Sequence, residues 1–256
     1  MATPVPCIDP ARPRPKMKPF TAWRHMQKLI ADKEDTEQVF HIIEALNGDS
    51  VVHDFDRFLA SEHGAGEFAK RAYLPDLLDD HDIVGAMPEG SVGRAYVDFM
   101  TREGLSAAGL VAESEAHRKT AQDFDDDLAW YINRLRDTHD LYHVLSGYGR
   151  DALGEAALLK YTHSQHRGRG IAFIAFMGAR QIAKHVPASA RIKEVMVEAR
   201  DHGHRAQRVV DQDIAALLKE PLESARARIG IAPPLAYKAA LRVFAESDLT
   251  PMLNAA

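Results

Sequence analysis

Apolar residues along most of this chain recur three or four positions apart, which is the spacing of one face of an α-helix. The clearest example runs from Asp125 to Ser146, a stretch that contains neither glycine nor proline. Its apolar positions are Leu128, Ile132, Leu135, Tyr142 and Leu145. We expect Gly147 to end this helix, because glycine readily adopts the left-handed conformation found at helix ends. Asp151 can then cap a new helix, which places Glu155 in its first turns.

The same spacing predicts helices elsewhere. Asp35 and Gln38 are typical of a capping pair that begins one helix, with Gly48 as its end. Asp49 or Ser50 can begin the next helix. Further helices are expected over residues 65–80, 91–103, 171–185, 190–219 and 221–229. The sequence shows neither a long alternating run that would require a strand nor an internal repeat. We therefore predict an all-α fold, with residues 19–256 forming a single compact multi-helix domain.

Residues 1–18 differ from the rest in being rich in proline and in basic side chains. The basic residues are Arg12, Arg14, Lys16 and Lys18. No apolar stretch follows that would make a secretory signal, and the prolines oppose an amphipathic mitochondrial presequence. We expect a disordered, solvated tail. The alternative is a basic arm that contacts anionic lipid.

Composition and charge narrow the class of protein. With 256 residues, 46% of them hydrophobic, the chain can bury a sizeable core. It carries 32 basic and 37 acidic residues, a formal net charge of −5, so nucleic acid is not the expected partner. Cys7 is the single cysteine, so the chain has no internal disulfide, which fits a reducing compartment.

The segment Ile171–Ala179 is apolar on every face but is far too short to span a bilayer. A buried central helix is one interpretation. The other is a helix that lines an apolar ligand tunnel, with Phe173, Phe176 and Met177 as its walls. Arg167 precedes this segment and either belongs to a polar helix end or binds an anionic head group.

The strongest candidate for chemistry is a set of two histidines and two carboxylates. His139 and His143 lie four residues apart, so their imidazoles project from one face of the predicted helix. Asp140 adjoins His139, and Glu155 comes from the start of the next helix. Such a set can hold one divalent metal ion between two helices. Because neighbouring helical residues point about 100° apart, Asp140 either ligates from the side or orients an imidazole. A metal-free polar contact between the helices is the alternative.

This His-Asp-x-x-His motif, followed after eleven residues by Glu155, resembles the signature of the coenzyme Q (ubiquinone) biosynthesis protein 4 family. Two further segments match that family: Pro88–Tyr96, which leads into Asp98–Met100, and Pro221–Ile231. The resemblance runs from about Leu74 to Ile231, which is most of the predicted domain.

The resemblance implies an all-helical protein that binds zinc through His139, Asp140, His143 and Glu155, the same residues forming its catalytic site. It also implies a long isoprenoid guest. The reaction of the family removes the carboxylate at C1 of a polyprenylated 4-hydroxybenzoate precursor of ubiquinone, in some members with hydroxylation of that carbon. Zinc has no redox chemistry, whereas an oxidative course needs an electron acceptor, and the ligand set also suits iron, manganese or magnesium.

Three function classes are therefore open. The first is a metal-dependent decarboxylase, and the second is a non-catalytic scaffold that binds isoprenoid quinone precursors and holds a structural metal. A metallohydrolase is the third. The expected partners are a polyprenylated aromatic or isoprenoid lipid, other quinone biosynthesis enzymes and a membrane surface, and a homodimer is compatible with these. We expect a cytoplasmic protein peripheral to the inner membrane, or one on the mitochondrial matrix side in a eukaryote.

Overall fold

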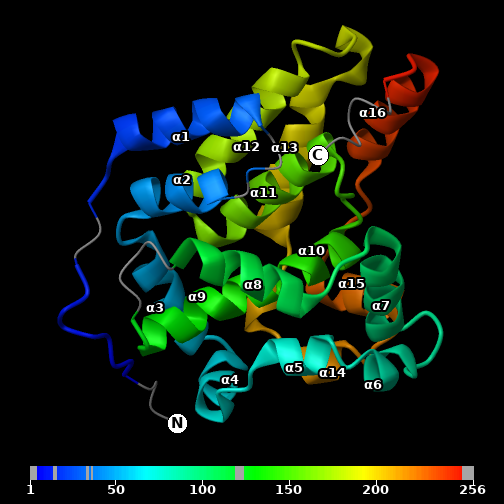
Figure 1. The fold of residues 1–256 in the computed structure, drawn as a ribbon. Helices are drawn as coiled ribbons and strands as arrows, with labels where there is room; N and C mark the ends of the chain where they lie inside the picture. Colours follow the sequence, from blue (N-terminus) through cyan, green and yellow to red (C-terminus); the bar gives the residue numbers. More distant parts are fainter. Residues whose placement is uncertain (1–4, 14–15, 33–34, 36, 119–123, 250–256) are drawn as a thin grey trace. The chain divides into compact units, whose positions relative to one another are not determined.

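The chain folds into helices throughout the part described by the computed structural model, which is residues 5–13, 16–32, 35, 37–118 and 124–249 (Figure 1). Within these ranges there are α-helices and two short 3-10 helices but no strand. The predicted all-α class is therefore confirmed. Among the described helices, none is both long and apolar enough to cross a bilayer.

The helices divide into two compact units, each made from interleaved segments of the chain. Unit 1 comprises Met1–Arg14, Val51–Leu145 and Gln207–Ile229, and unit 2 comprises Pro15–Ser50, Ser146–Ala206 and Gly230–Ala256. The first boundary thus falls between residues 14 and 15, whereas the boundary predicted from the sequence follows residue 18. Most of the basic segment at 1–18 belongs to unit 1.

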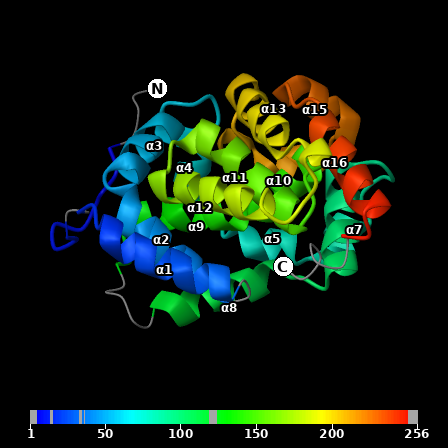
Figure 2. The same cartoon turned by 90° about the horizontal axis from the view of Figure 1, so that it is seen from above.

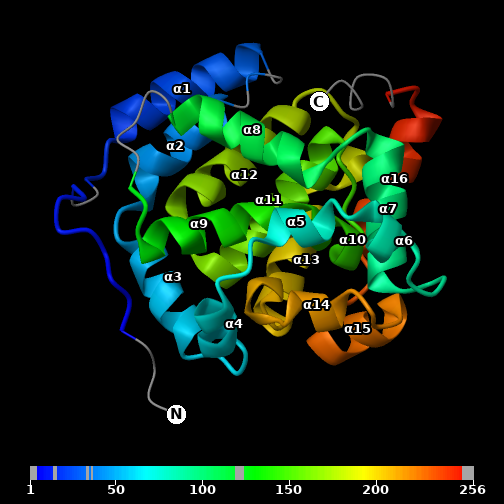
Figure 3. The ribbon, with the colours of Figure 1, turned by 60° about the horizontal axis from the view of Figure 1, so that its bottom comes forward.

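Unit 1 is built mainly from the middle of the chain. Its helices are α3 (Ser50–Leu59), α4 (Gly64–Lys70), α5 (Leu74–Leu78), α6 (His81–Gly85), α7 (Val92–Glu103), α8 (Ala107–Arg118), α9 (Asp127–Asp137), α10 (His139–Ser146), η2 (Val209–Asp211), α14 (Ile214–Leu217) and α15 (Leu222–Ile229). Figure 3 shows α7 beside α6 and α15. Aromatic rings form much of the core, where Phe55 stacks on Tyr131 with ring centroids 4.9 Å apart. These contacts join α3 to α9.

Unit 2 is organised around α11. Its helices are α1 (Pro19–Ala31), α2 (Glu37–Asn47), α11 (Ala152–His166), α12 (Arg169–Ile182), η1 (Ala188–Ala190), α13 (Ile192–Arg205) and α16 (Leu235–Glu246). Helix α11 packs against α12 and α13, while α2 packs against both α1 and α12 (Figure 2). A cluster of buried apolar side chains from α1, α2 and α12 forms a core there: Ala22, Met26, Ile42, Ala45, Leu46 and Ile174.

Several predicted helices have different bounds in the structure. The expected helix over 125–146 is two helices, α9 and α10, separated by Thr138. The hydroxyl of Thr138 donates to the carbonyl of Arg134 at 2.9 Å, a local bond that competes with regular helix geometry. The expected helix over 190–219 ends at Arg205. Asp213 then caps a separate helix, α14, by accepting a hydrogen bond from the amide of Ala216 at 3.0 Å. The expected helix over 65–80 is likewise divided into α4 and α5.

Of the two interpretations of the segment that forms α12, a helix buried on every side is wrong. Ile174 and Ala175 are buried, but Phe176 is 62% exposed. Phe173 and Met177 are half-buried and pack against the core of unit 2. Because the neighbouring helices cover only part of its circumference, α12 has an apolar face in contact with solvent.

The basic segment at the start of the chain was expected to be a disordered tail, but residues Cys7–Arg12 are bound to the start of α9. We call this segment the N-terminal clasp. The backbone amide of Cys7 donates to Asp127 at 2.6 Å, and that of Asp9 donates to Asp126 at 3.0 Å. The guanidinium of Arg12 donates twice to Asp126, at 2.8 and 2.6 Å. Ile8 packs against the aromatic core, so the clasp is part of unit 1.

We expect Arg12→Ala to lower the free energy of unfolding by about 1–2 kcal/mol, because it removes a two-bond ion pair to a largely buried carboxylate. Burial alone would raise the pKa of Asp126, but hydrogen bonds from Arg12 and the amide of Ala129 outweigh it, and the pKa is lowered. A lowered pKa stabilises the fold at pH values above the ordinary pKa of the carboxyl. This stabilisation is lost as the pH falls through the lowered pKa. Urea denaturation at neutral and acid pH measures the difference.

The control for the clasp is Arg242→Ala, which removes an exposed arginine of α16 and should change stability by less than about 0.5 kcal/mol. Equal stability of Arg12→Ala and Arg242→Ala at neutral pH would show that the clasp does not stabilise unit 1. A difference that stayed constant on acidification would show that Asp126 is not its source.

Candidate metal site

The structure brings three of the predicted ligands together on α10. His139, Asp140 and His143 each offer one ligand atom, and these atoms all lie within 4.8 Å of one another. Asp140 and His143 are buried and His139 is half-buried. From the sequence, Asp140 either ligates the metal or orients an imidazole. In the structure it is close enough to both imidazoles to take part in the same site.

Aromatic side chains of α7 shield this cluster. The ring of Phe99 stacks on the imidazole of His143, with centroids 5.5 Å apart and an interplanar angle of 21°. The two imidazoles meet edge to face at 5.0 Å. Tyr96 is fully buried on the same helix, and its pKa is raised first by that burial and then by the negative charges of Asp140 and two further aspartates. The cluster therefore has an apolar wall on one side, which strengthens electrostatic interactions within it.

The end of α10 is fixed by an arginine from another part of unit 1. Arg226 of α15 donates to the carbonyls of Leu145 and Val144, each at 2.9 Å. A cation at the C-terminus of a helix binds carbonyls that lack a partner within the helix and interacts favourably with its dipole. Arg226 comes from the Pro221–Ile231 segment, so the sequence match there corresponds to a contact that holds the helix of the cluster.

The donor set fits a divalent metal ion. Two imidazole nitrogens and one carboxylate oxygen from one helix match the ligands of zinc, iron and manganese in proteins. Three protein ligands leave room in the coordination shell for a fourth group.

Glu155, the fourth predicted ligand, lies in unit 2 at the beginning of α11. The predicted cap of this helix is confirmed, because the carboxylate of Asp151 accepts hydrogen bonds from the amides of Leu153 and Gly154, each at 3.1 Å. A carboxylate oxygen of Glu155 lies 4.0 Å from the guanidinium of Arg150. A role of Glu155 as a metal ligand stays a prediction.

The predicted substrate-binding residues also lie in unit 2. Phe173, Phe176 and Met177 are on α12, half-buried or exposed, and Arg167 is the exposed residue that ends α11 in the left-handed conformation. The amide of Arg167 donates to the carbonyl of His163 at 2.7 Å, so this residue does form a polar helix end. The tunnel and the head-group contact stay predictions.

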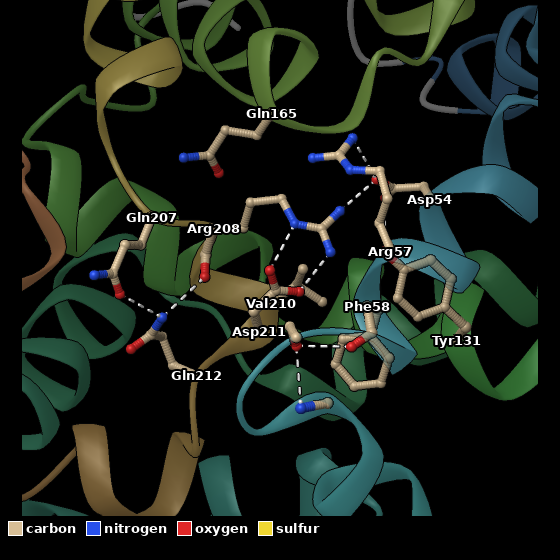
Figure 4. Close-up of polar contacts among 12 residues, drawn as sticks. Asp54, Arg57, Phe58, Tyr131, Gln165, Gln207, Arg208, Val210, Asp211 and Gln212 are labelled. Atoms are coloured by element: carbon tan, nitrogen blue, oxygen red, sulfur yellow. Dashed lines mark hydrogen bonds and ion pairs between the residues drawn. The ribbon is translucent and has the colours of Figure 1, made fainter. Parts of the chain in front are cut away.

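Sequence reasoning missed a second buried polar cluster, in unit 1 (Figure 4). The guanidinium of Arg208 donates to both carboxylate oxygens of Asp211, at 2.7 and 2.6 Å, and also to Asp54. The hydroxyl of Tyr131 donates to Asp54 at 2.6 Å, and Arg57 donates to it at 3.3 Å. Because these charges bind one another, the cluster is an internal ionic network rather than a site for a ligand.

The model of the family described as "Coenzyme Q (ubiquinone) biosynthesis protein Coq4" matches residues 25–235. The chain belongs to this Coq4 family. The match includes the whole of α10 and the cap and first turns of α11, and it confirms the resemblance seen in the sequence. The description of the family places its members in ubiquinone biosynthesis.

Curated relatives have the same family name. The chain is 26% identical over 179 residues to a protein of Rattus norvegicus named "Ubiquinone biosynthesis protein COQ4 homolog, mitochondrial", covering 70% of this chain and 64% of the relative. The Homo sapiens homologue is 26% identical over 182 residues, covering 70% of this chain and 65% of that one. The chain thus spans a little under two thirds of the length of these relatives.

A solved structure has the same fold. It is described as a putative ubiquinone biosynthesis protein from Nostoc punctiforme PCC 73102, and it superposes with a TM-score of 0.62 at 18% identity. The superposition covers 84% of this chain and 99% of the other. At this level of identity the likeness shows the shared all-helical fold.

Proposed function

We propose that this protein is a metal-dependent decarboxylase that removes the C1 carboxylate of a polyprenylated 4-hydroxybenzoate precursor of ubiquinone. The observation that supports this most is the cluster of His139, Asp140 and His143, whose ligand atoms lie within 4.8 Å of one another. Membership of the Coq4 family, which is described as acting in ubiquinone biosynthesis, supports a ubiquinone precursor as the substrate.

The chain's own residues supply position and environment for this reaction. The two imidazoles and Asp140 would hold the metal, with Glu155 as the predicted fourth ligand. Phe99 and Tyr96 limit water on the α7 side of the cluster, which keeps charge interactions strong there. A bound divalent cation supplies Lewis acidity, which stabilises negative charge on a carboxylate or phenolate oxygen.

Two balanced courses are open to this decarboxylation, one non-oxidative and one oxidative. In the simpler course the bond between C1 and the carboxylate breaks, carbon dioxide leaves and C1 takes up a proton. In the oxidative course one dioxygen and one water are consumed, C1 gains a hydroxyl group, and carbon dioxide and hydrogen peroxide leave. Zinc suits the first course, whereas iron or manganese suits a course that involves dioxygen.

The substrate class also implies where the protein acts. A polyprenyl chain resides in a membrane, so the protein is proposed to work as a peripheral membrane protein beside other quinone biosynthesis enzymes. If the organism is a eukaryote, the mitochondrial names of the relatives support a mitochondrial location, and the proposed place there is the matrix side of the inner membrane.

The test is conversion of a prenylated 4-hydroxybenzoate derivative, labelled in its carboxylate, by purified full-length protein reconstituted with zinc, iron or manganese. We expect release of labelled carbon dioxide with at least one of these metals. Mass spectrometry of the product, with and without dioxygen, distinguishes hydrogen from hydroxyl at C1. Tight binding of the substrate without release of label under all these conditions would overturn the decarboxylase and favour the isoprenoid-binding scaffold.

A further inference from the structure

One face of unit 2 exposes large apolar side chains beside basic ones. Phe20 and Trp23 of α1 are 92% and 46% exposed, and Phe176 of α12 has most of its surface in solvent. Ile30, near the end of α1, is also exposed. We call these four side chains, with the basic residues around them, the α1–α12 face. Scattered single apolar residues are ordinary on protein surfaces, but a group of aromatic ones on adjacent helices indicates a contact surface.

The two helices present this group together. Phe20, Trp23 and Ile30 are spaced by three and seven residues, which places them on one side of α1. A neighbouring side of α1 contributes Ala22 and Met26 to the core. The ring of Trp23 lies 6.5 Å from that of Phe173 on α12, so the exposed side of α1 continues onto α12.

The charged side chains within α1 and α12 are all basic, although the exposed Asp32 directly follows α1. The sequence has no acidic residue between Lys16 and Ala31, and none between Ala156 and Lys193, although the chain as a whole has a net charge of −5. The exposed basic side chains on α1, α12 and the segment before α1 are Lys16, Lys18, Arg24, Lys28, Arg169 and Arg180. Arg169 lies 3.5 Å from the sulfur of Met17, which connects the start of α12 with the segment that leads into α1.

We propose that the α1–α12 face docks on the surface of an anionic lipid bilayer. The proposal rests on the membrane location in the proposed function and identifies the surface responsible. Exposed aromatic side chains insert at the boundary between head groups and acyl chains, while lysines and arginines beside them attract lipid phosphates. Of the basic arm expected from the sequence, Lys16 and Lys18 belong to this surface, whereas Arg12 is held in its ion pair with Asp126.

The experiment is co-sedimentation of full-length protein with phosphatidylcholine vesicles, with and without phosphatidylglycerol. We expect binding that requires the anionic lipid and weakens as salt is added. Phe20→Ser/Trp23→Ser should weaken the partition constant by about tenfold or more, because two apolar groups no longer insert. Phe20→Ser alone should give a smaller loss in the same direction. Arg24→Glu/Lys28→Glu should abolish the dependence on anionic lipid.

Helix α16 of the same unit provides the matched controls. Leu235 is 68% exposed, between Phe20 and Trp23 in accessibility, so Leu235→Ser removes an accessible apolar side chain outside the proposed surface. Lys238→Glu reverses an exposed charge on the same helix. Both variants should bind vesicles as the unaltered protein does. Circular dichroism establishes that each variant keeps its helical content.

Three results would overturn the proposal. The first is vesicle binding by Phe20→Ser/Trp23→Ser and Phe20→Ser equal to that of the unaltered protein. The second is an equal loss with Leu235→Ser. The third is dissociation of a dimer by the α1 variants, measured by light scattering, with vesicle binding unchanged. That result would make the face a contact between two copies of this chain. Metal content and decarboxylation are measured separately, so an inactive protein that binds vesicles contradicts only the proposed reaction.

Discussion

Replacing Asp54 by alanine should lower the free energy of unfolding by about 3–5 kcal/mol, the cost typical of removing one partner from a buried ion pair. The side chain of Asp54 is 2% exposed and that of its partner Arg208 is 7% exposed. Without Asp54, the buried guanidinium of Arg208 retains Asp211 but loses its second carboxylate. The hydroxyl of Tyr131 loses the acceptor that lies 2.6 Å from it. Urea denaturation of the two proteins gives the difference.

The contributions of the charge and of the hydrogen bonds of Asp54 to stability can be measured separately. Asp54→Asn keeps the shape and an acceptor oxygen but removes the charge, so it should cost less than Asp54→Ala. Glu194→Ala is the matched control, because the ion pair of Glu194 with Arg191 is 60% and 69% exposed, and it should cost less than about 1 kcal/mol. A loss for Asp54→Ala no larger than that of the control would show that the network does not stabilise unit 1.

The sequence predicted those helices whose ends are set by local chemistry. Ser50 begins α3, and Gly147 follows the end of α10 in a left-handed conformation, as expected from the patterns of these residues. No helix was predicted at the position of α1, although Pro19 lies in its first turn, where proline is favoured. The spacing of Ala22, Met26 and Leu29 was the signal that could have identified it.

Features that depend on distant parts of the chain were not predictable in this way. Asp54 and Arg208 are 154 residues apart, and each looks like an ordinary surface charge in its own segment. The exposure of Phe176 also depends on which sides of α12 its neighbours cover. The metal-ligand cluster was predictable because its three residues lie within five positions of one helix, where helical geometry alone brings them together.

We expect the protein to bind one divalent metal ion per chain and His143→Ala to lower the affinity for that metal by at least about 100-fold, since removing even an orienting partner of a ligand costs about 10–100-fold. The reason is the position of His143, buried and within 4.8 Å of the ligand atoms of His139 and Asp140. His139→Ala should have the same effect. Elemental analysis of purified proteins and titration with zinc measure the stoichiometry and affinity.

Two carboxylate variants test the rest of the ligand set. Asp140→Asn should lower the affinity by about 10–100-fold if Asp140 orients an imidazole, and by as much as His143→Ala if it ligates the metal directly. Glu155→Gln should weaken binding only if Glu155 is the fourth ligand. The control is His185→Ala, which removes an exposed histidine of unit 2 and should leave the metal content unchanged. Full metal occupancy in both His139→Ala and His143→Ala would refute the site, and with it the Lewis acid on which the proposed decarboxylation depends.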